Sequence, residues 1–133
     1  MFRRIVFMFV LSIVAACGSA YAWDIESYRV NVDLVDRHDI SVAEEIVADF
    51  GYEQKHGIFR DIPTAYQDEQ GRALDIRFRI TAVEDGRGAA RRYTQNVGTN
   101  VTQVRIGDPS LTVSGRQTYV IRYVVSGALR SFP

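Results

Sequence analysis

The feature that most constrains the fold is a period-two alternation of apolar and polar residues. In residues 74–82, every second side chain is apolar, while Asp, Arg or Thr stand between them. This period places alternate side chains on opposite faces of a β-strand. Further stretches that we interpret as strands are 28–34, 40–50, 91–97, 101–106 and 118–125. No helical period of useful length follows residue 22, so the sequence predicts a mostly β domain.

Polar or glycine-containing turns separate these stretches. Roughly six to eight short antiparallel strands in such a chain predict an all-β fold, an antiparallel β-sandwich of the immunoglobulin-like or Greek-key type. A partly open β-barrel is the alternative. Val120 and Val124 make the second face of the last strand apolar, which indicates a central position in its sheet. Residues 51–70 show little periodicity. They predict a long loop with an extended piece at 58–62 and one helical turn within 63–70.

Two adjacent acids interrupt the strand at 40–50. Glu44 falls in the same phase as the apolar residues, and Glu45 follows it. Because neighbouring side chains in a strand point to opposite faces, one of the two glutamates faces inward, sits at a bulge or lies near an edge.

The first 22 residues have the three-part order of a secretory signal. Arg3 and Arg4 precede an apolar run, and small residues close it before Ala22. We expect an N-terminal signal helix that is cleaved between Ala22 and Trp23, leaving a single domain at 23–133. A membrane anchor is the rival interpretation, but the run is shorter than the about 20 residues that a span needs. A second alternative is lipidation of Cys17, which follows a lipobox-like Val-Ala-Ala.

Composition excludes several functional classes for the cleaved chain. Cys17 is the single cysteine, so removal of the signal leaves no disulfide, thiolate nucleophile or cysteine-based metal site. Removing Arg3 and Arg4 from 16 basic residues leaves 14 against 16 acidic residues, a net charge of −2. Nucleic-acid binding needs a basic excess on one face, so we predict no nucleic-acid partner.

Four segments together resemble a known family, the N-terminal domain of bacterial membrane proteins designated DUF2207. They are IESYRV at 25–30 leading into the strand at 42–50, HGIFRDIP at 56–63, RIGD at 105–108 and TYVIRY at 118–123. The resemblance implies a signal peptide, this extracytoplasmic domain and then transmembrane helices, with no assigned activity. The sequence ends at Pro133 without such helices. We therefore expect a truncated gene, a fragment of a longer membrane protein, or a soluble member.

His56 is the most suggestive single residue for chemistry. It opens a glycine-bearing segment in which His56, Gly57, Arg60 and Asp61 form our candidate functional loop. A histidine near a carboxylate has the pKa range for general acid–base catalysis. The alternative is that the His56-Gly57 pair shapes a tight turn. The sequence offers no nucleophile elbow and no metal-ligand spacing, so we predict no catalytic set, cofactor or metal.

Aromatic residues outside the alternating positions suggest an interaction surface. Trp23, Tyr52, Phe59 and Tyr66 are the residues that we expect there. The leading hypothesis is a non-catalytic binding or structural module, periplasmic or on the extracytoplasmic face of the bacterial inner membrane. Its partner would be an envelope protein or the remainder of a membrane protein. The alternative function is an envelope hydrolase or metal-dependent enzyme that uses His56 and Asp61.

Overall fold

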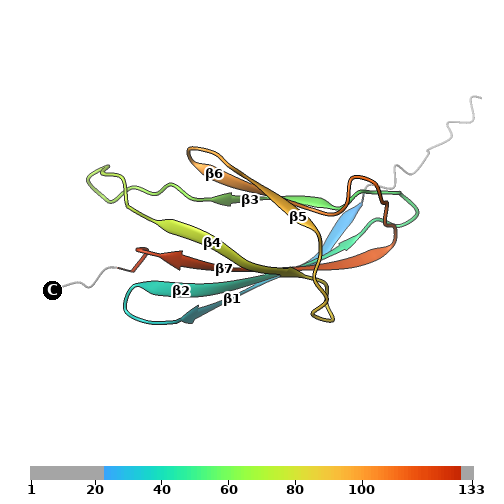
Figure 1. The fold of residues 1–133 in the computed structure, drawn as a ribbon, viewed down its shortest axis with the longest axis horizontal. Coiled ribbons are helices and arrows are strands. Elements are labelled where there is room, and N and C mark those ends of the chain that lie inside the picture. The colour runs from blue at the N-terminus through green and yellow to red at the C-terminus, as the bar shows by residue number, and fades with distance from the viewer. Residues whose placement is uncertain (1–22, 130–133) are drawn as a thin grey trace, which may run out of the picture.

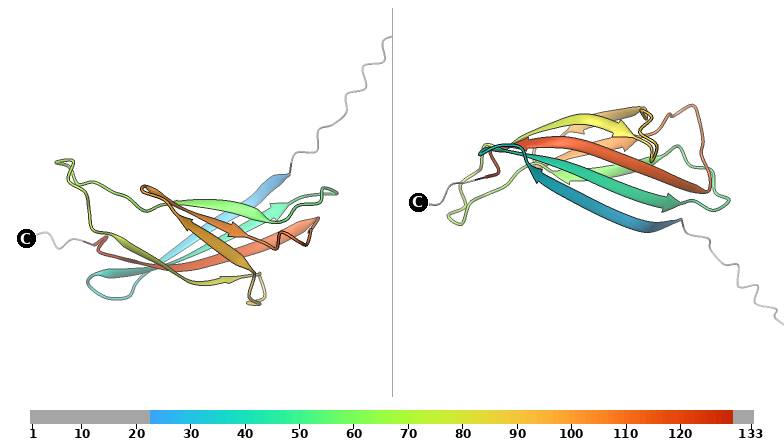
Figure 2. Two further views of the ribbon diagram at one scale, coloured as in Figure 1. Left: turned by 45° about the horizontal axis from the view of Figure 1, so that its top comes forward. Right: turned by 90° about the horizontal axis from the view of Figure 1, so that it is seen from below.

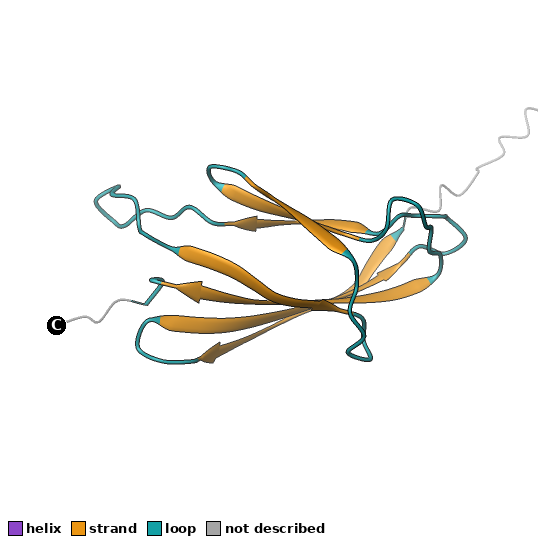
Figure 3. Cartoon of the chain, viewed as in Figure 1, coloured by secondary structure: helices purple, strands orange, loops and turns teal. Residues whose placement is uncertain are grey.

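A computed structural model describes residues 23–129, which form seven strands in two antiparallel sheets (Figures 1 and 3). The predicted signal sequence, with Cys17 and Ala22, lies outside the described residues. The strands are β1 (Asp24–Leu34), β2 (Asp39–Asp49), β3 (Ile58–Pro63), β4 (Arg77–Glu84), β5 (Tyr93–Val97), β6 (Val101–Ile106) and β7 (Arg116–Ser126). The predicted all-β sandwich is confirmed, and the described residues form no closed barrel.

The larger sheet has the strand order β1-β2-β7-β4. Figure 2 shows β1 (blue) at its edge, then β2 (teal) and then β7 (red). The β2–β7 ladder runs without a shift from Asp39 opposite Ser126 to Asp49 opposite Arg116. β7 therefore lies between two neighbours, as its two apolar faces predicted.

The smaller sheet has the order β3-β6-β5 and packs against the larger one. In the β3–β6 ladder, Ile58 lies opposite Ile106 and Pro63 opposite Val101. The core fills the space between the two sheets and contains aliphatic side chains together with Phe50, Tyr119 and Tyr123. Three of the five ladders, β2–β7, β4–β7 and β3–β6, pair strands that are not consecutive in the sequence, so the sandwich depends on contacts between distant segments.

The loop region departs from expectation in two places. The helical turn predicted within 63–70 does not form, because the loop 64–76 is held by backbone bonds such as Thr64 N to Asn100 O at 3.0 Å. The strand expected from residue 74 begins only at Arg77. The Leu74 amide donates instead to the Tyr66 carbonyl at 2.8 Å and closes the loop on itself.

The two sheets do not cover each other completely. Along β1, the side chains on the core-facing side are paired in register with the buried face of β2, yet 44–73% of each is exposed. These residues are Tyr28, Val30, Val32 and Leu34. The smaller sheet thus covers the inner strands of the larger sheet and leaves the apolar face of β1 largely open.

Candidate functional site

The centre of the polar chemistry is Glu44, the inward-facing member of the glutamate pair. It lies opposite Ile121 in the β2–β7 ladder and is only 2% exposed. Glu45, on the other face, makes a loose contact with Arg29 at 3.7 Å. Of the three positions that the sequence left open for one of these acids, the structure selects the inward-facing one, at Glu44.

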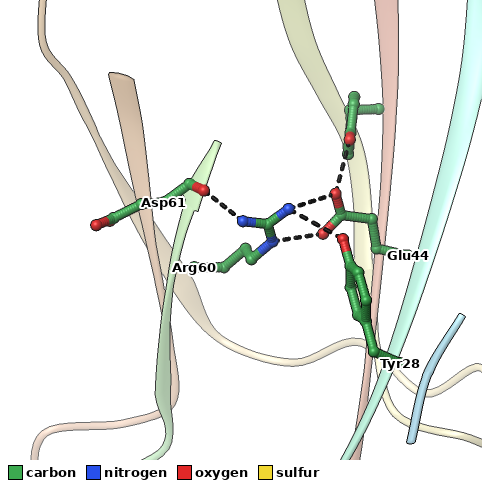
Figure 4. A network of polar contacts seen from close by, with 5 residues as sticks. Tyr28, Glu44, Arg60 and Asp61 are labelled. Carbon is green, nitrogen blue, oxygen red and sulfur yellow. Dashed lines mark hydrogen bonds and ion pairs between the residues drawn. The ribbon is translucent and has the colours of Figure 1, made fainter. Parts of the chain in front are cut away.

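Arg60 of β3 reaches across the interior to this carboxylate (Figure 4). Its Nε donates to Oε2 of Glu44 at 2.7 Å and its Nη2 donates to Oε1 at 2.9 Å. The Tyr123 hydroxyl of β7 donates to Oε1 at 2.8 Å. Nη2 also donates to the Tyr28 hydroxyl of β1 at 3.0 Å, and Nη1 donates to the carbonyl of Asp61. We call Tyr28, Glu44, Arg60 and Tyr123 the charge cluster.

The cluster favours the charged forms of Glu44 and Arg60 and the neutral forms of its two tyrosines. Burial opposes ionisation of Glu44, but hydrogen bonds from Arg60 and Tyr123 outweigh it and keep the pKa of Glu44 below its ordinary value. The bonds to Glu44 raise the pKa of Arg60. Burial, together with the Glu44 carboxylate, raises the pKa of Tyr123 and of Tyr28.

This arrangement favours a structural role for the cluster. A carboxylate with a depressed pKa that already accepts three strong hydrogen bonds is a poor proton acceptor. The same bonds join β1, β2 and β7 of the larger sheet to β3 of the smaller one. The cluster is therefore a fixed cross-link between the sheets. The sequence marks Glu44 as anomalous but does not reveal its partners. Tyr28 and Tyr123 stand at ordinary alternating strand positions, and Arg60 belongs to the predicted functional loop with His56.

Of the candidate loop, His56 and Gly57 shape the backbone. The His56 Nδ1 lies 2.8 Å from the Leu111 carbonyl, which can only accept, so Nδ1 carries the proton. Gly57 has φ +131°, and a Cβ there would lie 1.8 Å from the Ile106 carbonyl oxygen. A Cβ at Gly107 would likewise lie 1.8 Å from the His56 carbonyl oxygen. The two glycines let the start of β3 and the end of β6 approach closely.

Arg60 and Asp61 point to different surroundings from His56. Arg60 belongs to the charge cluster, and Asp61 accepts from the Gln103 side chain at 2.9 Å. Asp61 lies within β3, whereas His56 precedes it. The His56 ring contacts the Leu111 carbonyl, whereas the Asp61 carboxylate contacts Gln103. The structure therefore does not bring His56 and Asp61 together.

The four aromatic residues expected to form a partner surface separate into different places. Trp23 and Phe59 line one hollow of about 240 Å³ between β1 and β3, and Trp23 also packs on Phe50 with ring centroids 5.8 Å apart. Tyr66 lines a different pocket. Tyr52 is 96% exposed and lines neither. A partner surface on these residues stays a prediction.

An apolar pocket of about 410 Å³ lies at the end of the sandwich where β7 finishes. The core-facing residues Ile40, Val42 and Val125 form its floor on the larger sheet. The loop 64–76 contributes Tyr66 and Leu74, and Ala128 lines it just beyond β7. The β1–β2 turn, this loop and the exit of the chain lie together at the same end of the molecule (Figure 1). We call this feature the end pocket. Nothing in the sequence marked it, because its residues are separated by up to 88 positions between Ile40 and Ala128.

Membrane-spanning helices and metal-ligand clusters are both absent from the described residues. Residues 23–129 contain no helix that could span a bilayer. In the same part of the chain, His, Cys, Asp and Glu residues form no group of three suited to a metal ion.

Comparison with known proteins supports the resemblance given by the four segments. Curated proteins and solved structures gave no match. A family model described as the N-terminal domain of a predicted membrane protein, DUF2207, matches residues 24–133. Three of the four segments meet in the charge cluster, which takes Tyr28 from the first, Arg60 from the second and Tyr123 from the fourth. The match spans nearly all of the sequence beyond the predicted signal, and the chain belongs to the DUF2207 family.

Proposed function

We propose that this domain is an extracytoplasmic module with a binding or structural role, exported to the periplasm or the outer face of a bacterial inner membrane. In this proposal the end pocket receives a segment from the membrane-associated remainder of the same protein. The family description as the N-terminal domain of a predicted membrane protein supports such a neighbour. The signal-like residues 1–22 support export.

The position of the end pocket is the observation that carries the proposal. Its lining is mainly aliphatic and aromatic and includes Ala128, which lies just beyond the last strand. A segment that follows this strand therefore starts beside an apolar cavity. Burying apolar side chains there would gain roughly 25 cal/mol per Å² removed from water. Tyr123, which donates to Glu44 in the charge cluster, also lines this pocket.

The export part is tested by thiol labelling. Tyr52→Cys places a cysteine at a position that is 96% exposed, in the loop after β2. A membrane-impermeant maleimide should label this variant in intact spheroplasts, above the level seen for the parent protein with Cys17 alone. Labelling that occurs only after lysis contradicts export.

The docking part is tested by photo-crosslinking in native membranes. A benzoyl-phenylalanine replaces Tyr66 at the end pocket, and the matched control carries it at Tyr52, away from the pocket. We expect the probe at Tyr66, but not at Tyr52, to form crosslinks that map by mass spectrometry to the remainder of the same protein. Equal crosslinking from both positions, or crosslinks to other proteins alone, contradicts docking of that segment.

A further inference from the structure

The open edge of β1 is the longest regular edge that the described strands offer. β4 is broken by a register shift between Ile80 and Ala82, β3 is six residues long and ends at Pro63, and β5 has five residues. β1 has one irregularity, between Ile25 and Ser27, and then pairs regularly to Leu34. A long regular edge with an exposed apolar face is a template for pairing with another strand.

The hydrogen-bonding groups of this edge can be assigned from the ladder. The Val35 amide donates to the Asp39 carbonyl at 3.0 Å, and the same register pairs Leu34 with Ile40. In an antiparallel pair, bonded and non-bonded positions alternate. The odd-numbered residues of β1 therefore bond to β2, and the even-numbered residues from 28 to 34 direct their amides and carbonyls to the open edge.

We propose that β1 pairs with the β1 of a second copy of this protein, antiparallel, about a two-fold axis at Asn31. This register sets Arg29 opposite Asp33 of the second copy twice, once on each side of the axis. On the core-facing side it sets Val30 opposite Val32 and Tyr28 opposite Leu34. Opposite charges and apolar side chains directly across two strands both stabilise their pairing. The pair joins the two four-stranded sheets into one continuous sheet.

Other registers of the β1–β1 pair are unfavourable, either because of the charges that they set opposite each other or because of the alternation of side chains along the strand. An axis at Arg29 or Asp33 sets like charges opposite each other, and an axis at Val30 or Val32 leaves both charges without an opposite partner. An axis between two residues sets core-facing side chains against outward-facing ones, which the alternation of a strand forbids. The sequence of β1 from Tyr28 to Leu34 is thus self-complementary in one register, as an isologous interface requires.

The proposed contact also accounts for the exposed face of β1. Val32 and Leu34 are 57% and 73% exposed although they lie on the core-facing side. In the pair, each gains an apolar neighbour from the second copy. A contact of seven residues a side is small, so the dimer should be weak and dependent on concentration.

The first test is the oligomeric state of the purified protein and two charge variants, measured by sedimentation velocity over a range of concentrations. We expect the wild type to dimerise as concentration rises. Arg29→Asp gives the edge two acids, and Asp33→Arg gives it two bases. At the protein concentration at which half of the wild type is dimeric, each variant alone should therefore be monomeric. An equimolar mixture should dimerise, because every pair across the axis is then opposite in charge.

Two outcomes overturn the proposal. One is a wild type that stays monomeric at all concentrations, and the other is a dimer that neither charge change weakens. Thermal unfolding of each variant first establishes that the variant is folded. Its oligomeric state is then measured.

A second test does not depend on the charge variants. Residues opposite each other at a non-bonded position have Cα atoms about 4.5 Å apart, within disulfide range. In a Cys17→Ser background, Asn31→Cys should form an intermolecular disulfide under mild oxidation. Gln95→Cys on the exposed strand β5 is the control. Crosslinking of Asn31→Cys no faster than of Gln95→Cys overturns the proposed axis.

Discussion

At the scale of single residues, the charge cluster combines one deeply buried charge with one partly exposed charge. The Glu44 side chain is 3% exposed and the Arg60 side chain 28%. Removing one partner of a buried pair costs about 3–5 kcal/mol, because it leaves the other charge without compensation. The cost therefore depends on which partner is left behind, and the carboxylate is the more buried of the two.

We predict that Arg60→Met destabilises the domain more than Glu44→Leu. In Arg60→Met the buried carboxylate loses both guanidinium bonds and its counter-charge and keeps hydroxyl partners such as Tyr123. In Glu44→Leu the guanidinium keeps Tyr28, the Asp61 carbonyl and partial solvation. The double variant should lose less stability than the sum of the singles, since it leaves neither charge stranded. Urea unfolding measures all three. Additive losses would show that the two residues do not interact in the folded domain.

The close approach of β3 and β6 gives a second prediction at this scale. Gly57→Ala should destabilise the domain by several kcal/mol, because its Cβ meets the Ile106 carbonyl at 1.8 Å in addition to backbone strain. Gly51→Ala is the matched control: φ is +55° and nothing lies within 4 Å of the added Cβ. It should cost only about 1–2 kcal/mol of left-handed strain. Similar losses for the two variants in urea unfolding would contradict the close approach.

At the scale of elements, periodicity predicted which segments are strands but not where each one begins. The alternation in 74–82 continues smoothly, yet β4 starts at Arg77 because the Leu74 amide is used by the loop 64–76. The segment 58–62 was expected as a mere extended piece, and it became β3 by pairing with β6, about 40 residues away. The local sequence pattern does not reveal which distant strand will pair with a given segment. That pairing determines where the strand begins and ends.

The edge position of β1 predicts how it tolerates proline. Val32→Pro removes an amide that faces the open edge, so it should cost about 1 kcal/mol or less in the folding of the monomer. Asn31→Pro removes an amide that bonds to β2 and should cost about 3 kcal/mol or more. Thermal unfolding at low protein concentration compares them. A larger loss of stability for Val32→Pro than for Asn31→Pro would show that the even-numbered residues, and not the odd-numbered ones, bond to β2.

At the scale of the whole molecule, the family and the sandwich were predictable, while the sites were predictable only in part. Glu44 was identified as anomalous because an acid stood in an apolar phase, but its partner Arg60 was grouped with His56 and Asp61 as a functional loop. In β3 the side chain of Arg60 enters the interior while that of Asp61 faces Gln103. A linear motif does not reveal this divergence, and the end pocket depends wholly on tertiary packing.

Carboxylates with lowered pKa values determine how the stability of the whole domain depends on acid pH. Burial opposes ionisation of Glu44 but is outweighed by hydrogen bonds from Arg60 and Tyr123, and backbone amide bonds lower the pKa values of Asp36, Asp85 and Asp108. A group whose folded pKa is lowered stabilises the fold above its unfolded pKa and loses that contribution as pH falls through its folded pKa. With ordinary values of 4.5 for Glu and 3.8 for Asp, the free energy of unfolding should be steady near neutrality and decline below about pH 4.5.

Glu44→Gln separates the contribution of the cluster from that of the turn aspartates. At pH 7 the variant should be less stable, because a neutral amide replaces the charge that Arg60 pairs with. Its stability should then fall less steeply than that of the wild type as the medium is acidified, since one proton-linked group is gone. The exposed Glu69→Gln is the control and should follow the wild-type curve. Urea unfolding from pH 7 to pH 3 provides the measurement. Parallel curves for Glu44→Gln and the wild type would mean that Glu44 binds its proton equally well in the folded and the unfolded chain. That outcome would contradict the bonds that Glu44 accepts from Arg60 and Tyr123.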